Sequence, residues 1–283
     1  MSQDDILFSV VLPTSIDRGL ILPHSIGSIQ RQTVQNFEIL VIGDGVNDMT
    51  RSVINELSHQ DQRIRFFDFP KHPRRGEEYR HKLLMNEARG KYIAYLCDRD
   101  LYLPHHLETL ALYLEKYDFA STLNYTMLEG MESMVYGRKN LDAWNAPAWY
   151  LSCTGHTLAY YKKLPFGWRT TPSGQFTDIY MWEQFINQKD CRTYCGLEPT
   201  VLWFKRGNHP GMSTLERKEE LIRWEEIMRD KLLFQMKKEE ALHEMMSGFN
   251  FLHRNHPILI KGRKPSQVPS EVWKKIKKAL LLS

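Results

Sequence analysis

Two aspartates one residue apart, Asp98 and Asp100, are the residues of this chain with the clearest potential for chemistry. They follow the apolar run 91–96, which has the composition of a buried strand. Side chains alternate along a strand, so both carboxylates start on one face, and the following turn can bring them to one ligand. Such a pair can hold Mg²⁺ or Mn²⁺ against a diphosphate. A solvated surface turn is the alternative, because Asp-x-Asp also occurs there by chance.

The first half of the chain alternates short apolar runs with amphipathic stretches. The predicted strands are 7–12, 37–42, 63–69 and 92–96. The predicted helices are 22–32, 49–57 and 103–117, and a basic stretch reaching residue 88 precedes the fourth strand. This alternation predicts an α/β fold in which helices cover both faces of a mostly parallel sheet. Ligands of such sheets bind at the carboxyl ends of the strands.

Polar residues follow three of these strands, where a ligand is expected: residues 13–15, 43–48 and 98–100. Glycines on both sides of Asp44 allow a sharp turn and a close approach of the backbone to a ligand. Asp44 can then accept hydrogen bonds from a base or a ribose. The alternative is that this stretch is a tight connection, with Asp48 capping the next helix.

Four stretches in this order carry a resemblance to a known family. Residues 10–14, 25–33 and 37–45 resemble the amino-terminal half of family 2 glycosyltransferases, and residues 86–100 are similar to the stretch leading into that family's Asp-x-Asp motif. The resemblance implies the nucleotide-diphospho-sugar transferase (GT-A) fold, with a mixed, mostly parallel sheet. It predicts a catalytic domain over 1–214, divided near residue 106, and a helical, basic extension over 215–283.

The resemblance also implies an activity and a set of roles. The expected reaction is the inverting transfer of a sugar from a nucleoside diphosphate, with a UDP-sugar as the expected donor, to an acceptor hydroxyl. Pro13 and Thr14 would line the nucleotide pocket, Asp44 would bind the base, Asp98 would lie near the ribose or sugar, and Asp100 would bind Mg²⁺ or Mn²⁺. One departure is that Leu101 follows Asp100, where the family often has a further acid.

A basic segment lies between the third and fourth predicted strands, and Gly76 within it is a candidate hinge. Arg75 and Arg80 are its candidate diphosphate contacts. The equally weighted alternative is a solvated loop that leads into a helix whose apolar positions Leu83 and Leu84 face the sheet.

A candidate general base lies in the stretch 174–183, which resembles the family's acidic element on the acceptor side. Thr177 replaces the usual first acid, so Asp178 is the preferred base and Glu183 the reserve candidate. The alternative role of Asp178 is to cap a helix.

The loop 206–213 resembles the family's late histidine-bearing loop, and His209 would complete the cation site begun by Asp100. An ordinary loop histidine is the alternative reading. The aromatic residues Trp149, His156 and Trp168 are candidates for an acceptor pocket or, equally, for the core.

The composition is that of an ordinary globular protein, with 283 residues, 42% hydrophobic and 25% charged. No run approaches the length of a membrane span and no signal peptide is visible, so a cytoplasmic location is expected. From residue 261 onward, seven Lys or Arg face one Glu. This tail suits the inner face of a membrane and a lipid-linked or glycan acceptor, or it forms a helix that packs on its own domain. No recognised nucleic-acid-binding module is present, so no such partner is expected.

Two other functions remain open. A nucleotidyltransferase of related fold would show a glycine-rich phosphate loop with a lysine after the first strand, which residues 13–19 lack. A non-catalytic sugar-nucleotide-binding or assembly protein would keep the fold without turnover. The four acidic or imidazole groups at 98, 100, 178 and 209 favour the enzyme.

Overall fold

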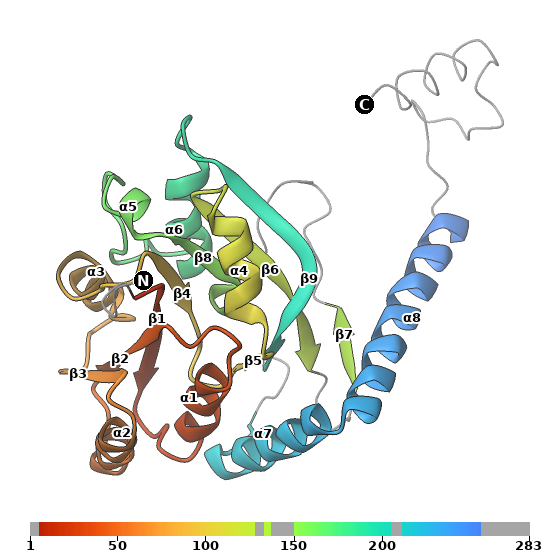
Figure 1. Cartoon of the computed structure of the whole chain (residues 1–283), viewed down its shortest axis with the longest axis horizontal. Helices are drawn as coiled ribbons and strands as arrows, with labels where there is room; N and C mark the ends of the chain where they lie inside the picture. The colour runs from red at the N-terminus through yellow and green to blue at the C-terminus, as the bar shows by residue number, and fades with distance from the viewer. Residues whose placement is uncertain (1–5, 128–132, 137–149, 205–210, 256–283) are drawn as a thin grey trace.

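One mixed sheet organises the chain (Figure 1). The computed structural model describes residues 6–127, 133–136, 150–204 and 211–255, and side chains up to residue 247. The strands are β1 (Phe8–Ser15), β2 (Phe37–Asp44), β3 (Ile64–Phe69), β4 (Tyr92–Tyr95), β5 (Leu101–Tyr102), β6 (Phe119–Met127), β7 (Met134–Tyr136), β8 (Thr154–Thr157) and β9 (Thr193–Trp203). Their order in the sheet is β3-β2-β1-β4-β8-β6-β9-β5, with β7 paired to β6.

The helices pack on both faces of this sheet. They are α1 (Leu22–Gln30), α2 (Asp48–Gln60), α3 (Glu77–Asn86), α4 (His106–Leu114), α5 (Leu158–Tyr161), α6 (Thr177–Ile186), α7 (Thr214–Arg229) and α8 (Lys231–Asn255), with a 3₁₀ turn at Leu151–Cys153. The strands β3, β2, β1 and β4 are parallel, as the alternating pattern predicts. Antiparallel pairs join β4 to β8 and β8 to β6, which makes the sheet mixed.

Alternation along the strands builds the two cores. Val10 and Leu12 of β1 pack in the core that includes residues of α1 and α4, whereas Val11 packs on the opposite face beside residues of α3 and α6. Since both faces of β1 are covered, its apolar run is continuous rather than alternating with polar residues. Leu83 and Leu84 of α3 are buried in the second core, as the alternative reading of the basic segment predicts.

Two local expectations need correction. Asn47, not Asp48, caps α2, because its side-chain oxygen accepts a hydrogen bond from the Thr50 backbone at 2.9 Å, while Asp48 lies in the first turn. The helix expected over 103–117 is shorter, spanning His106–Leu114, because Leu101 and Tyr102 before it form β5 and pair with β9.

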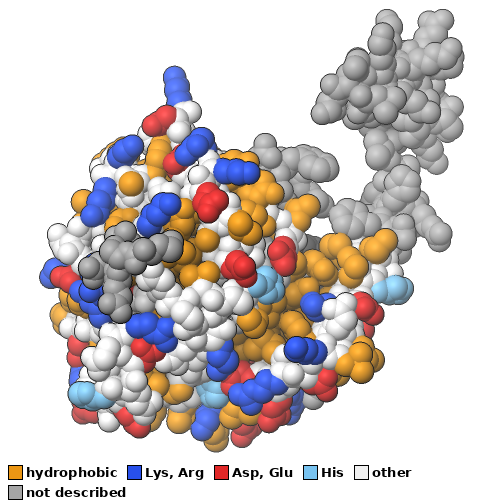
Figure 2. Space-filling model, viewed as in Figure 1, with side chains coloured by type: hydrophobic (Ala, Val, Ile, Leu, Met, Phe, Trp, Pro, Cys, Tyr) orange, Lys and Arg blue, Asp and Glu red, His pale blue; other side chains and the backbone are white. Residues whose placement is uncertain are grey.

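The helix α7 belongs to the packed body of the protein. Its Leu221 and Trp224 lie in a third core with Leu101 of β5. Glu225 accepts a hydrogen bond from Arg31, just after α1, at 2.5 Å and pairs with His24 of α1 at 3.0 Å. The next helix, α8, packs against β7 and extends away from the body (Figure 1). Hydrophobic side chains gather in the angle between α8 and the body (Figure 2), where a groove of about 630 Å³ lies.

The basic tail, from residue 261 onward, lies outside the described residues. No helix among the described residues is long and apolar enough to cross a membrane.

Candidate functional site

The carboxyl ends of β1, β2 and β4 bring three of the predicted residues to one edge of the sheet. In the register of β1 and β2, Ser15 lies opposite Asp44, so Thr14 and Asp44 are on neighbouring strand ends. On the other side of β1, the Thr14 hydroxyl donates to the Asp98 carboxylate at 3.0 Å. Pro13 precedes this contact on β1 and is half-buried. The parallel register alone therefore joins residues that lie 84 positions apart in the sequence.

Asp44 is held in place by the segment that follows β3. Its carboxylate accepts a hydrogen bond from the His72 backbone N–H at 2.6 Å and pairs with the ammonium group of Lys71. Gly45 and Gly76 both have left-handed backbones, with φ of 66° and 64°. A side chain at Gly45 would also collide with Lys71, and one at Gly76 would approach the Asp44 carboxylate. The glycines thus allow the basic segment to close onto Asp44.

Asp98 and Asp100 have different environments, although they are one residue apart. Asp98 accepts from Thr14 and lies 3.3 Å from the Arg18 guanidinium. Asp100 is fully buried; one oxygen accepts from the Ser152 hydroxyl at 2.5 Å and the other from the Phe204 backbone at 3.0 Å. Burial raises the pKa of Asp100, against the lowering effect of these donors and of a neighbouring arginine.

Asp178, the preferred base, lies in the first turn of α6 and does not cap the helix. Burial raises its pKa, and Arg80, a hydrogen bond from the Leu151 backbone, and Arg75 lower it by less. Its charge also acts on Arg99 of the Asp98–Asp100 turn, so the predicted base and the acidic turn share one electrostatic environment. The reserve candidate Glu183 is exposed and lies five residues further along α6, about 140° around the helix.

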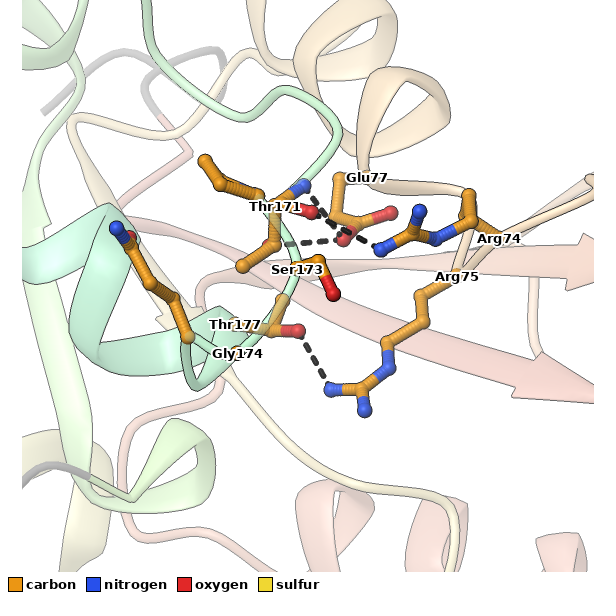
Figure 3. Close-up of a pocket in the computed structure, with 9 residues that line it drawn as sticks. Arg74, Arg75, Glu77, Thr171, Ser173, Gly174 and Thr177 are labelled. Carbon is orange, nitrogen blue, oxygen red and sulfur yellow. Dashed lines mark hydrogen bonds between the residues drawn. The ribbon is translucent and has the colours of Figure 1, made fainter.

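The two predicted diphosphate arginines approach α6. The Arg75 guanidinium donates to the Thr177 hydroxyl at 2.7 Å (Figure 3). Arg80 is buried, and its guanidinium carbon lies 4.7 Å from the centre of the Trp168 ring. Two nitrogens of Arg80, Nε and Nη1, have no hydrogen-bond partner among the described residues. The positive charges of both arginines favour an ionised Asp178, and their contact with a diphosphate stays a prediction.

A polar cavity of about 170 Å³ opens between the loop before α3 and the start of α6 (Figure 3). Arg74 and Arg75 form one side of it, and Thr171 and Thr177 the other. Glu77 is buried there, with one carboxylate oxygen bonded to the Thr171 hydroxyl at 2.9 Å and the other without a hydrogen-bond partner among the described residues. The cavity therefore presents both donors and an acceptor to a polar ligand.

The described carboxylates fit a divalent cation poorly. Both oxygens of Asp100 are already bonded to protein donors, and His209 lies outside the described residues. Another group, His72, Glu77 and Glu78, has possible ligand atoms within 4.8 Å of one another. There, however, Nδ1 of His72 accepts from the Arg74 backbone at 3.0 Å, so the ring proton is on Nε2, which faces Glu78 at 3.3 Å. This imidazole is paired with an acid and offers no lone pair to a metal.

The structure adds residues that the sequence pattern did not reveal. Arg18, from the loop after β1, forms an ion pair with Asp98, and Ser152, from the 3₁₀ turn, donates a hydrogen bond to Asp100. Arg99, the residue between the two aspartates, also belongs to this site, and its position in the motif was the only sequence signal that could have indicated it. Of the aromatic candidates, His156 and Trp168 are core residues joined through the Tyr95 hydroxyl at 2.7 and 3.0 Å, and Trp149 lies outside the described residues.

Comparison with known proteins gives one family match. The family model described as "Glycosyl transferase family 2" matches residues 9–170. Among curated relatives, the chain is 33% identical over 102 residues to the Campylobacter jejuni GalNAc(5)-diNAcBac-PP-undecaprenol beta-1,3-glucosyltransferase, a match that covers 36% of this chain and 32% of that protein.

A second relative is the Escherichia coli UDP-Glc:alpha-D-GlcNAc-diphosphoundecaprenol beta-1,3-glucosyltransferase WfgD, 32% identical over 108 residues, which are 38% of this chain and 40% of that protein. The matches therefore span about a third of the length of these relatives. Among solved structures, TarS 1-349 of S. aureus in complex with UDP-GlcNAc has a TM-score of 0.56 at 15% identity, covering 88% of this chain and 74% of that one.

Proposed function

Because the chain belongs to glycosyl transferase family 2 and shares the GT-A fold of TarS, we propose that it transfers a sugar from a nucleoside-diphosphate sugar to an acceptor hydroxyl with inversion. One observation carries this proposal. Asp44, Thr14 and Asp98 lie along the carboxyl edge of the parallel strands, where Thr14 donates to Asp98, and the charge of Asp178 acts on Arg99 beside Asp98. Nucleotide ligands of such sheets bind at this edge.

The chemistry places opposite demands on the two ends of the site. As the acceptor oxygen bonds to the anomeric carbon, the bond from that carbon to the diphosphate breaks, and its electron pair leaves with the phosphate oxygen. The acceptor hydroxyl gives its proton to Asp178, which must be ionised beforehand. Arg80 and Arg75 favour that ionised form. Fixed positive charge near the diphosphate stabilises the leaving group with little reorganisation during the reaction.

The donor we propose is a UDP-sugar. The TarS structure is a complex with UDP-GlcNAc, and the name of WfgD gives a UDP-glucose donor. The names of both glucosyltransferase relatives give undecaprenol-linked acceptors. We therefore propose for this chain a lipid-linked or glycan acceptor in glycolipid or polysaccharide synthesis, with action at the cytoplasmic face of a membrane. No nucleic acid is part of this proposal.

Mg²⁺ or Mn²⁺ remains the proposed cofactor. When bound, the ion would supply charge to the diphosphate, as family resemblance suggests. The described carboxylates do not complete a cation site. Asp100 is fully buried and each of its oxygens accepts one hydrogen bond, so it would offer an ion only the lone pairs that Ser152 and Phe204 leave free. Asp98 is the better-placed carboxylate, because its Oδ1 is 4.0 Å from the Arg99 guanidinium, beyond hydrogen-bond distance. No step of the reaction above is derived through the ion.

The test is a donor panel with matched variants. Purified protein is incubated with UDP-, GDP-, CDP- and dTDP-sugars, with and without Mg²⁺ or Mn²⁺, and release of the nucleoside diphosphate is measured. We expect release with at least one donor, and Asp178→Asn should lower kcat by about 10²–10⁴-fold while sparing UDP binding. Glu183→Gln, five residues along the same helix, is the control and should keep its activity. No release with any donor would favour a non-catalytic binding protein, and normal transfer by Asp178→Asn would remove that residue from the base role.

A further inference from the structure

Arg99 lies between the two aspartates of the acidic turn, and its surroundings differ from those of a solvated turn residue. Its side chain is 29% exposed. A guanidinium stays protonated in proteins, so Arg99 carries a positive charge beside the two aspartates. A cation is therefore already built into the turn where the sequence pattern predicts a metal ion.

The carboxylate of Asp100 is committed to holding the turn. Its two oxygens accept from Ser152, which in turn accepts from the Cys97 backbone at 3.0 Å, and from the Phe204 backbone. These bonds connect the turn to the 3₁₀ segment and to the end of β9. Asp100 thus fixes the backbone on either side of Arg99.

The Arg99 guanidinium is anchored at one end and open at the other. Its Nε donates to the carbonyl oxygen of Phe204 at 3.0 Å, the same residue whose N–H binds Asp100. Its Nη1 is 4.0 Å from Asp98, beyond hydrogen-bond distance. Among the described residues neither terminal nitrogen has a hydrogen-bond partner. A guanidinium held at Nε keeps its two terminal nitrogens as a fixed fork for a phosphate.

The position of this fork matches the nucleotide edge of the sheet. Asp98, one residue away, is bonded to Thr14 at the end of β1 and is 3.3 Å from Arg18. The charge of Asp178 also acts on Arg99. Arg99 is therefore next to the strand end expected to hold the nucleotide and within electrostatic range of the carboxylate expected to take the acceptor proton.

We propose that Arg99 binds the diphosphate of the donor through its two terminal nitrogens and supplies, from the protein itself, positive charge that stabilises the leaving nucleoside diphosphate. This inference rests on the proposed function and deepens it. Asp100 is then a positioning residue for Arg99, and Arg18 is a second cation, 3.3 Å from the other oxygen of Asp98. Binding of the nucleotide would not require a divalent cation, although turnover could still respond to one.

The experiment compares ligands with and without phosphate. Binding of UDP and of uridine is measured by calorimetry for the whole chain and for Arg99→Gln and Arg99→Lys, each in EDTA and in Mg²⁺. Arg192→Gln is the matched control, because Arg192 pairs with Asp118 at the opposite end of β9. Thermal unfolding verifies that each variant is folded.

We expect Arg99→Gln to raise the Kd for UDP by about 10–100-fold, the usual effect of losing charged hydrogen bonds, while the Kd for uridine changes little. Arg99→Lys should recover part of the loss, because lysine keeps the charge but not the fork. The wild-type chain should keep most of its affinity for UDP in EDTA.

Two results would overturn the proposal in distinguishable ways. The first is that Arg99→Gln binds UDP as tightly as the wild-type chain does, or that UDP binding by the wild-type chain disappears in EDTA. Either outcome would show that Arg99 does not bind the diphosphate, while the proposed sugar transfer would stand. If the wild-type chain binds none of UDP, GDP, CDP and dTDP, the proposed function fails and the role of Arg99 fails with it.

Discussion

Replacing Glu38 with glutamine tests how the strand framework beneath the site is held together. Glu38 is 1% exposed near the start of β2. One of its oxygens accepts from the Ser9 hydroxyl at 2.7 Å and from the Arg89 backbone at 2.8 Å. The other accepts from Arg65 at 2.8 Å and from two nitrogens of Arg89 at 2.9 and 2.7 Å. The carboxylate thus joins β1, β2, β3 and the segment before β4.

The size of the effect follows from this count of donors. In glutamine an NH₂ group replaces one of the two carboxylate oxygens. It would then face two or three hydrogen-bond donors with no acceptor among them, because donors surround each oxygen of Glu38. Breaking a buried ion pair costs about 3–5 kcal/mol, and since Arg89 is 57% exposed and partly regains hydration, about 2–4 kcal/mol is expected here. At about 2–3 °C per kcal/mol for a chain of this length, Tm should fall by about 4–12 °C.

The pH dependence has a definite sign. Burial raises the pKa of Glu38, but hydrogen bonds from Arg89, Ser9 and Arg65 outweigh it and hold that pKa below its usual range. The unfolded chain therefore binds the proton more readily, so this contribution to stability is complete above the usual glutamate pKa of about 4.3 and is lost as the pH falls through the lower folded value. The difference in Tm between wild type and Glu38→Gln should be largest at neutral pH and should narrow in acid.

Thermal unfolding followed by circular dichroism measures both effects. Glu56→Gln is the control, because Glu56 is exposed on α2 and its change should alter the free energy of unfolding by less than about 0.5 kcal/mol. Equal Tm values for Glu38→Gln and wild type at neutral pH would refute the reasoning that this buried carboxylate stabilises the framework.

Three further predictions concern the site and its support. Asp44→Asn should raise the Kd for UDP about 10-fold or more in calorimetry, because a charged hydrogen-bond acceptor for the uracil base is lost. Unchanged affinity would show that uracil binds away from Asp44. Burial raises the pKa of Asp178 and Arg80 lowers it, so the acidic limb of the pH profile of kcat/KM should lie at higher pH than an ordinary aspartate would give. Arg80→Gln should move this limb to still higher pH. An acidic limb at the same pH in wild type and Arg80→Gln would contradict the reasoning. Gly90→Ala should yield little folded protein, since a Cβ there lies 2.2 Å from the Ser9 backbone nitrogen; a normal Tm would show that the strands can separate at no cost.

Local sequence patterns were sufficient for the first half of the fold. The continuous apolar runs of β1, β2 and β4 gave strands buried on both faces, and the polar residues after them marked the edge where Thr14, Asp44 and Asp98 meet. The reason is that parallel strands align their carboxyl ends, so a residue's place at a strand end already fixes its place in the site. The second half was harder, because β8 and β9 insert beside β4 and β6 out of chain order.

What the sequence by itself determined was therefore the set of acidic residues, the alternation that builds the sheet, and the edge at which a ligand would bind. Only the tertiary structure decided what each carboxylate bonds to. Asp98 and Asp100 look equivalent in the sequence, yet Asp100 is bonded to Ser152, 52 residues away, and to Phe204, 104 residues away. Those partners fix Asp100 inside the protein and leave the Arg99 fork open, because the satisfaction of a buried charge depends on long-range packing that no local pattern contains.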